Sequence, residues 1–145
     1  VTEGLDFDQV VDAITDYKSK TKLLFVLAKV DNLVKNGRLS KLIGTVVGLL
    51  NIRMVGEASK TGTLELLQKA RGQKKAIKAA FDELIKAGYA GGHITIAHRN
   101  NEKFIEQFSE LIRDKFAQAS IEVLPTSGLC SFYAEEGGLL MGYEI

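Results

Sequence analysis

The chain of 145 residues contains no tryptophan, one proline and one cysteine. The lone Cys130 cannot form a disulfide within the chain, which favours a reducing, cytoplasmic setting. No uninterrupted apolar run approaches the ~20 residues that a membrane-spanning helix needs, and no segment has the pattern of a signal peptide. We therefore expect a cytoplasmic protein without a membrane span.

An excess of charge of either sign is also absent. The 19 Lys and Arg residues nearly balance 18 Asp and Glu residues, and the formal net charge of +1 argues against a nucleic-acid-binding protein. The hydrophobic content of 46% is sufficient for the core of one domain. Because we see no repeat or linker, we expect residues 1–145 to form a single domain. The chain starts at Val1 without methionine, which is consistent with a fragment or a processed product.

Few residues are suited to metal binding or catalysis. His93 and His98 are the only histidines, and on a strand at residues 93–98 they would point to opposite faces. Cys130 with carboxylates alone is a poor zinc-binding set. We expect no metal, no cofactor and no catalytic residue. An enzyme that uses a Cys130–His98 pair is the alternative, although nothing in the spacing brings the two residues together.

Helix and strand patterns alternate along the chain. Apolar runs or alternation predict strands at residues 23–30, 52–56, 64–67, 93–98, 121–124 and 139–143. Helical spacing predicts helices after Asp6, at 39–50 and 72–87, after Asn100 or Asn101, and around 130–136. The run at 23–30 suits a strand buried on both faces, as in a parallel sheet. The class is therefore α/β, with a mixed β-sheet of about four to six strands flanked by helices.

The most apolar segment follows a turn signalled by Asn36 and Gly37. Its apolar residues recur at helical spacing and comprise Leu39, Leu42, Ile43, Val46, Val47 and Leu50. Gly44 and Gly48 lie on another face, where they allow either tight packing or the approach of a ligand. Such a helix is buried in the domain, packed on a partner or part of a cavity wall, and the pattern alone favours plain burial.

Basic residues are concentrated between Lys69 and Lys78, where no acidic residue interrupts them. If this segment is helical, one face carries Arg71, Lys74, Lys75 and Lys78. We predict that these four residues dock an acidic partner or a phosphate. The alternative is an ordinary solvated helix face.

Hydroxyl and thiol groups gather near the C-terminus, at Thr126, Ser127, Cys130, Ser131 and Tyr133. They lie beside backbone amides at the start of a predicted short helix. Hydroxyls and amides in that arrangement can hold a carboxylate or a phosphate.

Four motifs occur in an order that resembles the DegV family. They are KNGRLSK at residues 35–41, LLNIR at 49–53, KARGQKKA at 69–76 and IAHRNNE at 96–102. The resemblance implies the C-terminal α/β domain of a two-domain protein that binds a long-chain fatty acid between its domains. It further implies a carrier subunit that presents the fatty acid to a bacterial fatty acid kinase.

The resemblance also implies which residues bind the ligand. The acyl tail would enter a tunnel lined by Leu33, Leu42, Ile43, Val46, Val47 and Leu50, with Arg38 holding the turn or the acid. Many members carry a glycine-x-histidine-x-glycine-proline-glycine type loop, whereas this chain has CSFYAEEGG at residues 130–138. Tyr133, Ser131 or Cys130 would substitute for that histidine, and Ser127 is a further candidate for contact with the ligand. Without the N-terminal domain the tunnel would be uncovered, so we expect the isolated chain to self-associate.

Overall fold

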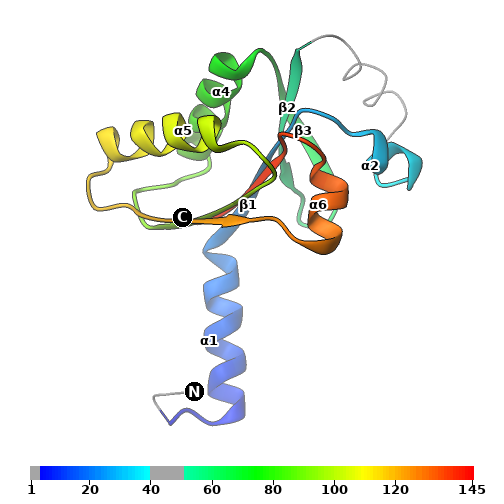
Figure 1. Cartoon of the computed structure of the whole chain (residues 1–145). Coiled ribbons are helices and arrows are strands. Elements are labelled where there is room, and N and C mark those ends of the chain that lie inside the picture. Colours follow the sequence, from blue (N-terminus) through cyan, green and yellow to red (C-terminus); the bar gives the residue numbers. More distant parts are fainter. Residues whose placement is uncertain (1–3, 40–50) are drawn as a thin grey trace.

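The computed structural model describes residues 4–39 and 51–145 (Figure 1). The helices are α1 (Phe7–Ser19), α2 (Asp31–Lys35), α4 (Gln73–Lys86), α5 (Glu102–Lys115) and α6 (Gly128–Ala134). The strands are β1 (Thr21–Leu27), β2 (Ile52–Ala58), β3 (Leu64–Arg71), β4 (His93–His98), β5 (Ser120–Pro125) and β6 (Leu139–Glu144). In the described residues, no helix is long and apolar enough to cross a bilayer.

The six strands form one mixed sheet in the order β3-β2-β1-β6-β4-β5. This confirms the predicted class and strand number. The expectation that residues 23–30 form a strand of parallel pairing was wrong. Strand β1 pairs antiparallel with both β2 and β6. Its central position still explains the apolar run, since both faces of Leu24–Leu27 are buried. The parallel pair is β4 with β5.

One face of the sheet is covered by α4 and α5 (Figure 1). Alternate strand residues such as Leu24, Val26 and Ile96 point into this layer and are at most 1% exposed. Phe104 and Phe108 of α5 fill the space above them, each 0% exposed. Among the described residues, this is the larger of two apolar clusters, and it sets the position of both helices.

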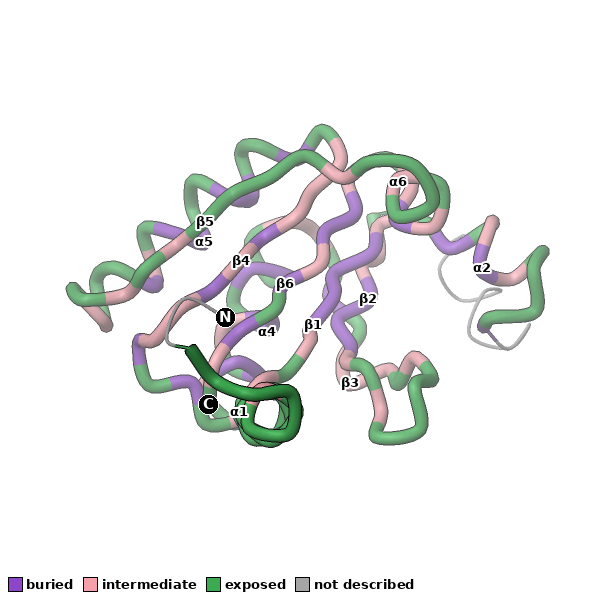
Figure 2. Tube along the Cα trace, turned by 90° about the horizontal axis from the view of Figure 1, so that it is seen from below, coloured by how far each residue is buried: buried purple, intermediate pink, exposed green. Residues whose placement is uncertain are grey.

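The opposite face, which Figure 2 views directly, carries a smaller apolar cluster. Phe25, Leu27 and Met54 belong to it, together with Leu33 of α2 and Ala134 of α6. These two short helices lie at the same end of the sheet (Figure 1). The sheet thus separates the main core from a second apolar region that α2 and α6 border.

Helix α1 projects away from the body of the domain (Figure 1). It begins as predicted, because the Asp6 carboxylate accepts from the Gln9 amide at 2.9 Å and the Gln9 side chain accepts from the Asp6 amide at 3.0 Å. None of its residues is buried. At its C-terminal end, the Tyr17 hydroxyl donates to Glu144 Oε1 at 3.1 Å, which ties the helix to β6.

Most predicted elements are present at the predicted places, with ends shifted by a few residues. Helix α2 is an addition, because the segment between β1 and the Asn36–Gly37 turn carries only a short apolar pattern. The predicted helix at 39–50 lies almost wholly outside the described residues. So do the tunnel residues Leu42, Ile43, Val46, Val47 and Leu50.

Candidate functional site

The end of α2 sets the position of Arg38. Gly37 adopts a φ of 67°, and the amides of Gly37 and Arg38 donate to the carbonyls of Val34 and Leu33. This is the glycine-terminated helix end known as the Schellman motif, which requires a left-handed residue at that point. The Asn36–Gly37 signal in the sequence was therefore correct, and the turn fixes where the Arg38 side chain begins.

Arg38 meets Tyr133 of α6, although the two residues lie far apart in the sequence. Its Nε–H donates to the Tyr133 hydroxyl at 3.1 Å, and its guanidinium carbon lies 5.4 Å from the centre of the Tyr133 ring. Tyr133 also stacks edge-to-face on Phe132. A guanidinium has five N–H donors in a planar fork, and Tyr133 uses only the Nε–H in this contact. The pair can therefore present an oriented cation to an acid.

Apolar side chains lie directly beside this pair. Leu33 is 4% exposed and Leu39 is 8% exposed, and both belong to the smaller apolar cluster. Tyr133 packs against the same cluster through its ring. An oriented cation next to a buried apolar region is the combination that an amphiphile with an anionic head group needs.

Polar contacts hold α2 and α6 together. The Asn32 amide of α2 donates to Glu135 Oε1 at 2.9 Å, and the Asn32 side chain donates to the Phe132 carbonyl at 2.8 Å. Val30 at the start of α2 has no capping side chain, so the Glu135 carboxylate satisfies that helix end instead. The distance between Arg38 and Tyr133 is thus fixed by a second set of contacts.

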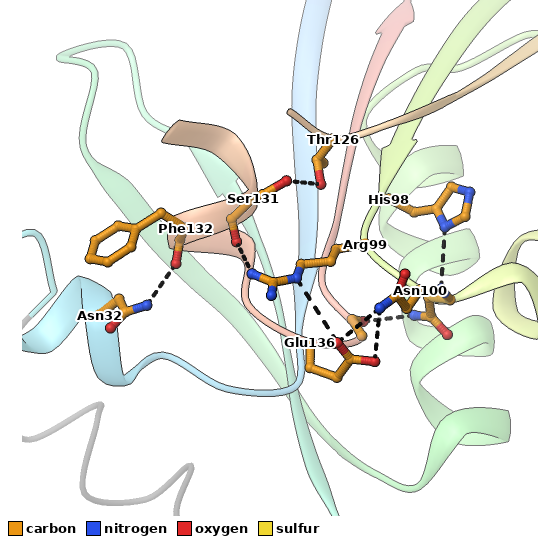
Figure 3. A network of polar contacts seen from close by, with 10 residues as sticks. Asn32, His98, Arg99, Asn100, Thr126, Ser131, Phe132 and Glu136 are labelled. Carbon is orange, nitrogen blue, oxygen red and sulfur yellow. Dashed lines mark hydrogen bonds and ion pairs between the residues drawn. The ribbon is translucent and has the colours of Figure 1, made fainter. Parts of the chain in front are cut away.

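A second network ties α6 to the end of β4 (Figure 3). Arg99 Nη1 donates to the Ser131 carbonyl at 2.8 Å, and its Nε lies 3.9 Å from Glu136 Oε2. The side chain of Asn100 donates to the same Glu136 carboxylate at 3.1 Å. The loop after β4 therefore orients α6, although none of these side chains belongs to the predicted ligand set.

The remaining predicted head-group residues do not converge on Arg38 in the same way. The Ser131 hydroxyl lies 2.8 Å from the Thr126 hydroxyl (Figure 3). Ser127 and Cys130 are exposed, and the Ser127 side chain forms no capping hydrogen bond to α6. Of the four predicted residues, Tyr133 is the one in contact with Arg38.

His98 has a structural partner. Its Nδ1 accepts from the Asn101 amide at 3.2 Å, so it closes the turn between β4 and α5 (Figure 3). Among the described residues, no hydrogen bond links His98 to Cys130. Within residues 4–39 and 51–145 no group of three metal-ligating side chains is found.

The predicted basic helix face needs one correction. Arg71 is the last residue of β3, and α4 starts at Gln73 after the N-cap Gly72, whose φ is 83°. Arg71 therefore cannot share a helical face with Lys74, Lys75 and Lys78, because the glycine turn separates the strand from the helix. The three lysines do lie on α4, and all are exposed.

A partly buried arginine, Arg53 of β2, lies near the loop that joins α6 to β6. A methyl group built on Gly137 would lie 3.5 Å from Arg53 Nη1. Burial lowers the pKa of the Arg53 guanidinium. In the described part of the chain, its Nε and Nη1 atoms are buried without a hydrogen-bond partner. Arg53 therefore places positive charge beside Gly137 in the loop after α6. It belongs to the LLNIR motif, but the motif did not indicate this position.

Sequence reasoning missed Asn32, Arg99, Asn100, Glu135 and Glu136. One of them carried a faint signal: Asn100 adopts a φ of 49°, and asparagine is enriched in that left-handed region and in turns. The partners of these side chains lie up to 103 positions away, which local patterns do not specify.

Comparisons with known proteins identify the family of the chain. A family model described as "Uncharacterised protein, DegV family" matches residues 1–143. The chain belongs to the DegV family. A DegV domain-containing protein of Streptococcus pneumoniae is 77% identical over all 145 residues, which correspond to 52% of its length. The chain thus spans about half the length of the curated DegV relatives it matches.

Two solved DegV-like structures share the whole fold. The Streptococcus pneumoniae Fatty Acid Kinase (Fak) B3 protein, solved with linoleic acid, is 78% identical with a TM-score of 0.96, over 99% of this chain and 51% of that one. A DegV family protein from Eubacterium eligens, solved with heptadecanoic acid, is 37% identical with a TM-score of 0.94, over 99% and 52%. The six-stranded mixed sheet is therefore the DegV fold.

Proposed function

We propose that this chain is the tail-binding domain of a two-domain protein that binds one long-chain fatty acid. The observation that carries the proposal is the pairing of an oriented cation, Arg38, with the apolar cluster beneath it. Two similar proteins of about twice the length were solved with fatty acids, which supports the same ligand class here. The sequence-based expectation and these comparisons agree.

In this proposal Arg38 and Tyr133 contact the carboxylate. The Tyr133 hydroxyl holds the Nε side of the guanidinium, which directs the Nη groups toward an acid in the paired geometry that arginine and carboxylates favour. The acyl tail lies against Leu33, with Leu42, Ile43, Val46, Val47 and Leu50 completing the tunnel as predicted from the sequence. Each methylene removed from water contributes ~0.8 kcal/mol, so a long tail supplies most of the affinity.

We further propose that the protein is a carrier and not an enzyme. His98 serves the β4–α5 turn, and Cys130 is an exposed thiol that forms no hydrogen bond with a base among the described residues. The similarity to a protein named for a fatty acid kinase supports a role in presenting the bound acid to such a kinase. The predicted docking role belongs to this proposal for Lys74, Lys75 and Lys78 of α4, without Arg71, which ends β3.

The two-domain arrangement has its own support in α1. Phe7, Val11, Ile14 and Tyr17 are 80%, 43%, 62% and 52% exposed. A helix with an apolar stripe and no buried residue normally packs on something. The additional length of the relatives supplies the candidate, and the proposal places the other half of the protein against this stripe.

The test uses the delipidated full-length protein and palmitate, with affinity measured by titration calorimetry. Arg38→Ala should weaken binding about tenfold, because a charge-assisted contact is lost. Tyr133→Phe, which keeps the ring under the guanidinium, should weaken it about threefold. Arg113→Ala on α5 is the matched control and should bind as wild type. Failure of the wild-type protein to bind any fatty acid would refute the function, and wild-type affinity in Arg38→Ala would refute the head-group assignment.

A further inference from the structure

A groove runs between α4 and α5 on the outside of the domain. The two helices contact each other. The groove has a volume of about 930 Å³, and its lining includes Ile77, Phe81 and Leu111. It lies over the face of the sheet that carries the larger core, whereas the Arg38–Tyr133 pair borders the other cluster. The groove is therefore separate from the proposed lipid site.

The floor of the groove is apolar and recessed. Ile77 is 7% exposed, while Phe81 and Leu111 are half-buried. A hollow between two helices accepts the ridge of side chains on a third helix. An apolar floor of this kind fits leucine-like side chains at one face of an amphipathic helix.

The border of the groove is basic. Lys74, Lys75 and Lys78 line it from α4, and Lys115 of α5 lies 5.8 Å from the centre of the Phe81 ring. Asp82 pairs with Lys78 at 2.6 Å, which neutralises that lysine. Among the ion pairs of the described residues, neither Lys74 nor Lys75 takes part, so both charges are available to a partner.

We propose that the groove between α4 and α5 is the docking site for an acidic amphipathic helix of a partner protein. The apolar face of that helix covers Ile77, Phe81 and Leu111, and its glutamates or aspartates meet Lys74 and Lys75. An anionic membrane is the weaker match, because apolar side chains that enter a bilayer protrude from the surface, whereas these lie below the lysines. This inference rests on the proposed carrier role in one respect: a carrier needs a partner protein.

The probe is a fluorescent synthetic helix of about 18 residues, or five turns, with leucines on one face and glutamates elsewhere. Its twin carries lysine in place of every glutamate. Binding to the full-length protein is measured by fluorescence anisotropy. The acidic helix should bind, its affinity should fall as salt is raised, and the basic twin should bind at least about tenfold more weakly.

Two variants locate the contact. The double reversal Lys74→Glu with Lys75→Glu should weaken binding of the acidic helix about tenfold. The matched control Lys22→Glu with Lys60→Glu makes the same charge change at exposed lysines outside the groove and should stay within about twofold of wild type. Leu111→Ala, which shortens the floor, should weaken binding about fivefold.

Several results would overturn the proposal. The two helices could bind alike, or the two double reversals could behave alike. Binding to vesicles of phosphatidylcholine with phosphatidylglycerol could depend on Lys74 and Lys75 while binding of the acidic helix does not. That result would assign this face to a membrane. A peptide of residues 5–19 could displace the acidic helix, and the protein could self-associate under the same conditions. These two results together would assign the groove to a second copy of the chain. Lipid content is measured on the same samples. Absence of lipid would refute the carrier role, and it would not change what the binding data say about the groove.

Discussion

Helices α1 and α5 have similar patterns and opposite surroundings. Both are amphipathic, with apolar residues recurring at helical spacing. The stripe of α5 is buried in the main core, and Phe108 is 0% exposed, whereas Phe7 at the start of α1 is 80% exposed. The pattern alone therefore shows which face will be buried, and it does not show whether the partner lies within the same chain.

The largest expected effect is a difference between two identical substitutions. In the isolated chain, Phe108→Ala should lower the free energy of unfolding by ~3–5 kcal/mol, because it leaves a cavity in the core. Phe7→Ala, on the exposed helix, should change it by less than ~0.5 kcal/mol when the chain is dilute enough to be monomeric. Urea denaturation followed by circular dichroism measures both, and equal losses would contradict the contrast between the helices.

The second effect concerns the same residue in a longer protein. In the full-length protein Phe7→Ala should cost ~2 kcal/mol, because the other domain then covers the stripe of α1. Thermal unfolding and amide exchange in α1 measure the change. Ala13, exposed on the same helix, provides the control Ala13→Ser. A neutral Phe7→Ala in the full-length protein would mean that α1 has some other partner.

The third effect is on association of the isolated chain, which we predicted from an uncovered tunnel. The exposed apolar stripe of α1 is a second surface that can drive it. Replacing Phe7 and Ile14 with aspartate should weaken self-association at least about tenfold, or ~1.4 kcal/mol, because charges enter the contact. Sedimentation velocity over a range of concentrations measures it. A wild-type chain that stays monomeric at the highest concentration would disprove the prediction.

The smallest effect depends on pH. Hydrogen bonds from the His93 amide and the Tyr17 hydroxyl hold the pKa of Glu144 below its ordinary value of 4.5. A lowered pKa in the folded state stabilises the junction of α1 with β6 above the unfolded pKa, and this contribution is lost as pH falls through the folded pKa. Carboxyl NMR titration should give a pKa below that of free glutamate, and Tyr17→Phe should move it upward. A pKa at or above the ordinary value would exclude the junction.

The sequence predicted the fold well because its signals are local. The capping box at Asp6 and Gln9, the turn at Asn36 and Gly37, and the apolar run of β1 each depend on neighbouring residues. The antiparallel pairing of β1 was missed because burial on both faces occurs in any central strand, whatever its direction.

The candidate site was predictable only in part. Arg38 came from the resemblance to a family and Tyr133 from the cluster of hydroxyl groups near the C-terminus. Their contact across 95 positions could not be read from spacing. Asn32 with Glu135, and Arg99 with Glu136, were missed because a polar residue reveals its partner only after the chain has folded. Arg71 was assigned to the wrong element because basic residues lie on both sides of Gly72. Their spacing did not indicate the strand-to-helix turn at that glycine.

The central claim is that the full-length protein carries a long-chain fatty acid in a tunnel that this domain helps to form. Native mass spectrometry of the full-length protein as purified should show one bound small molecule per chain. Denaturing extraction of the same sample should then release it as a fatty acid. Recovery of no lipid from natively purified protein, with no uptake of added palmitate, would contradict the account.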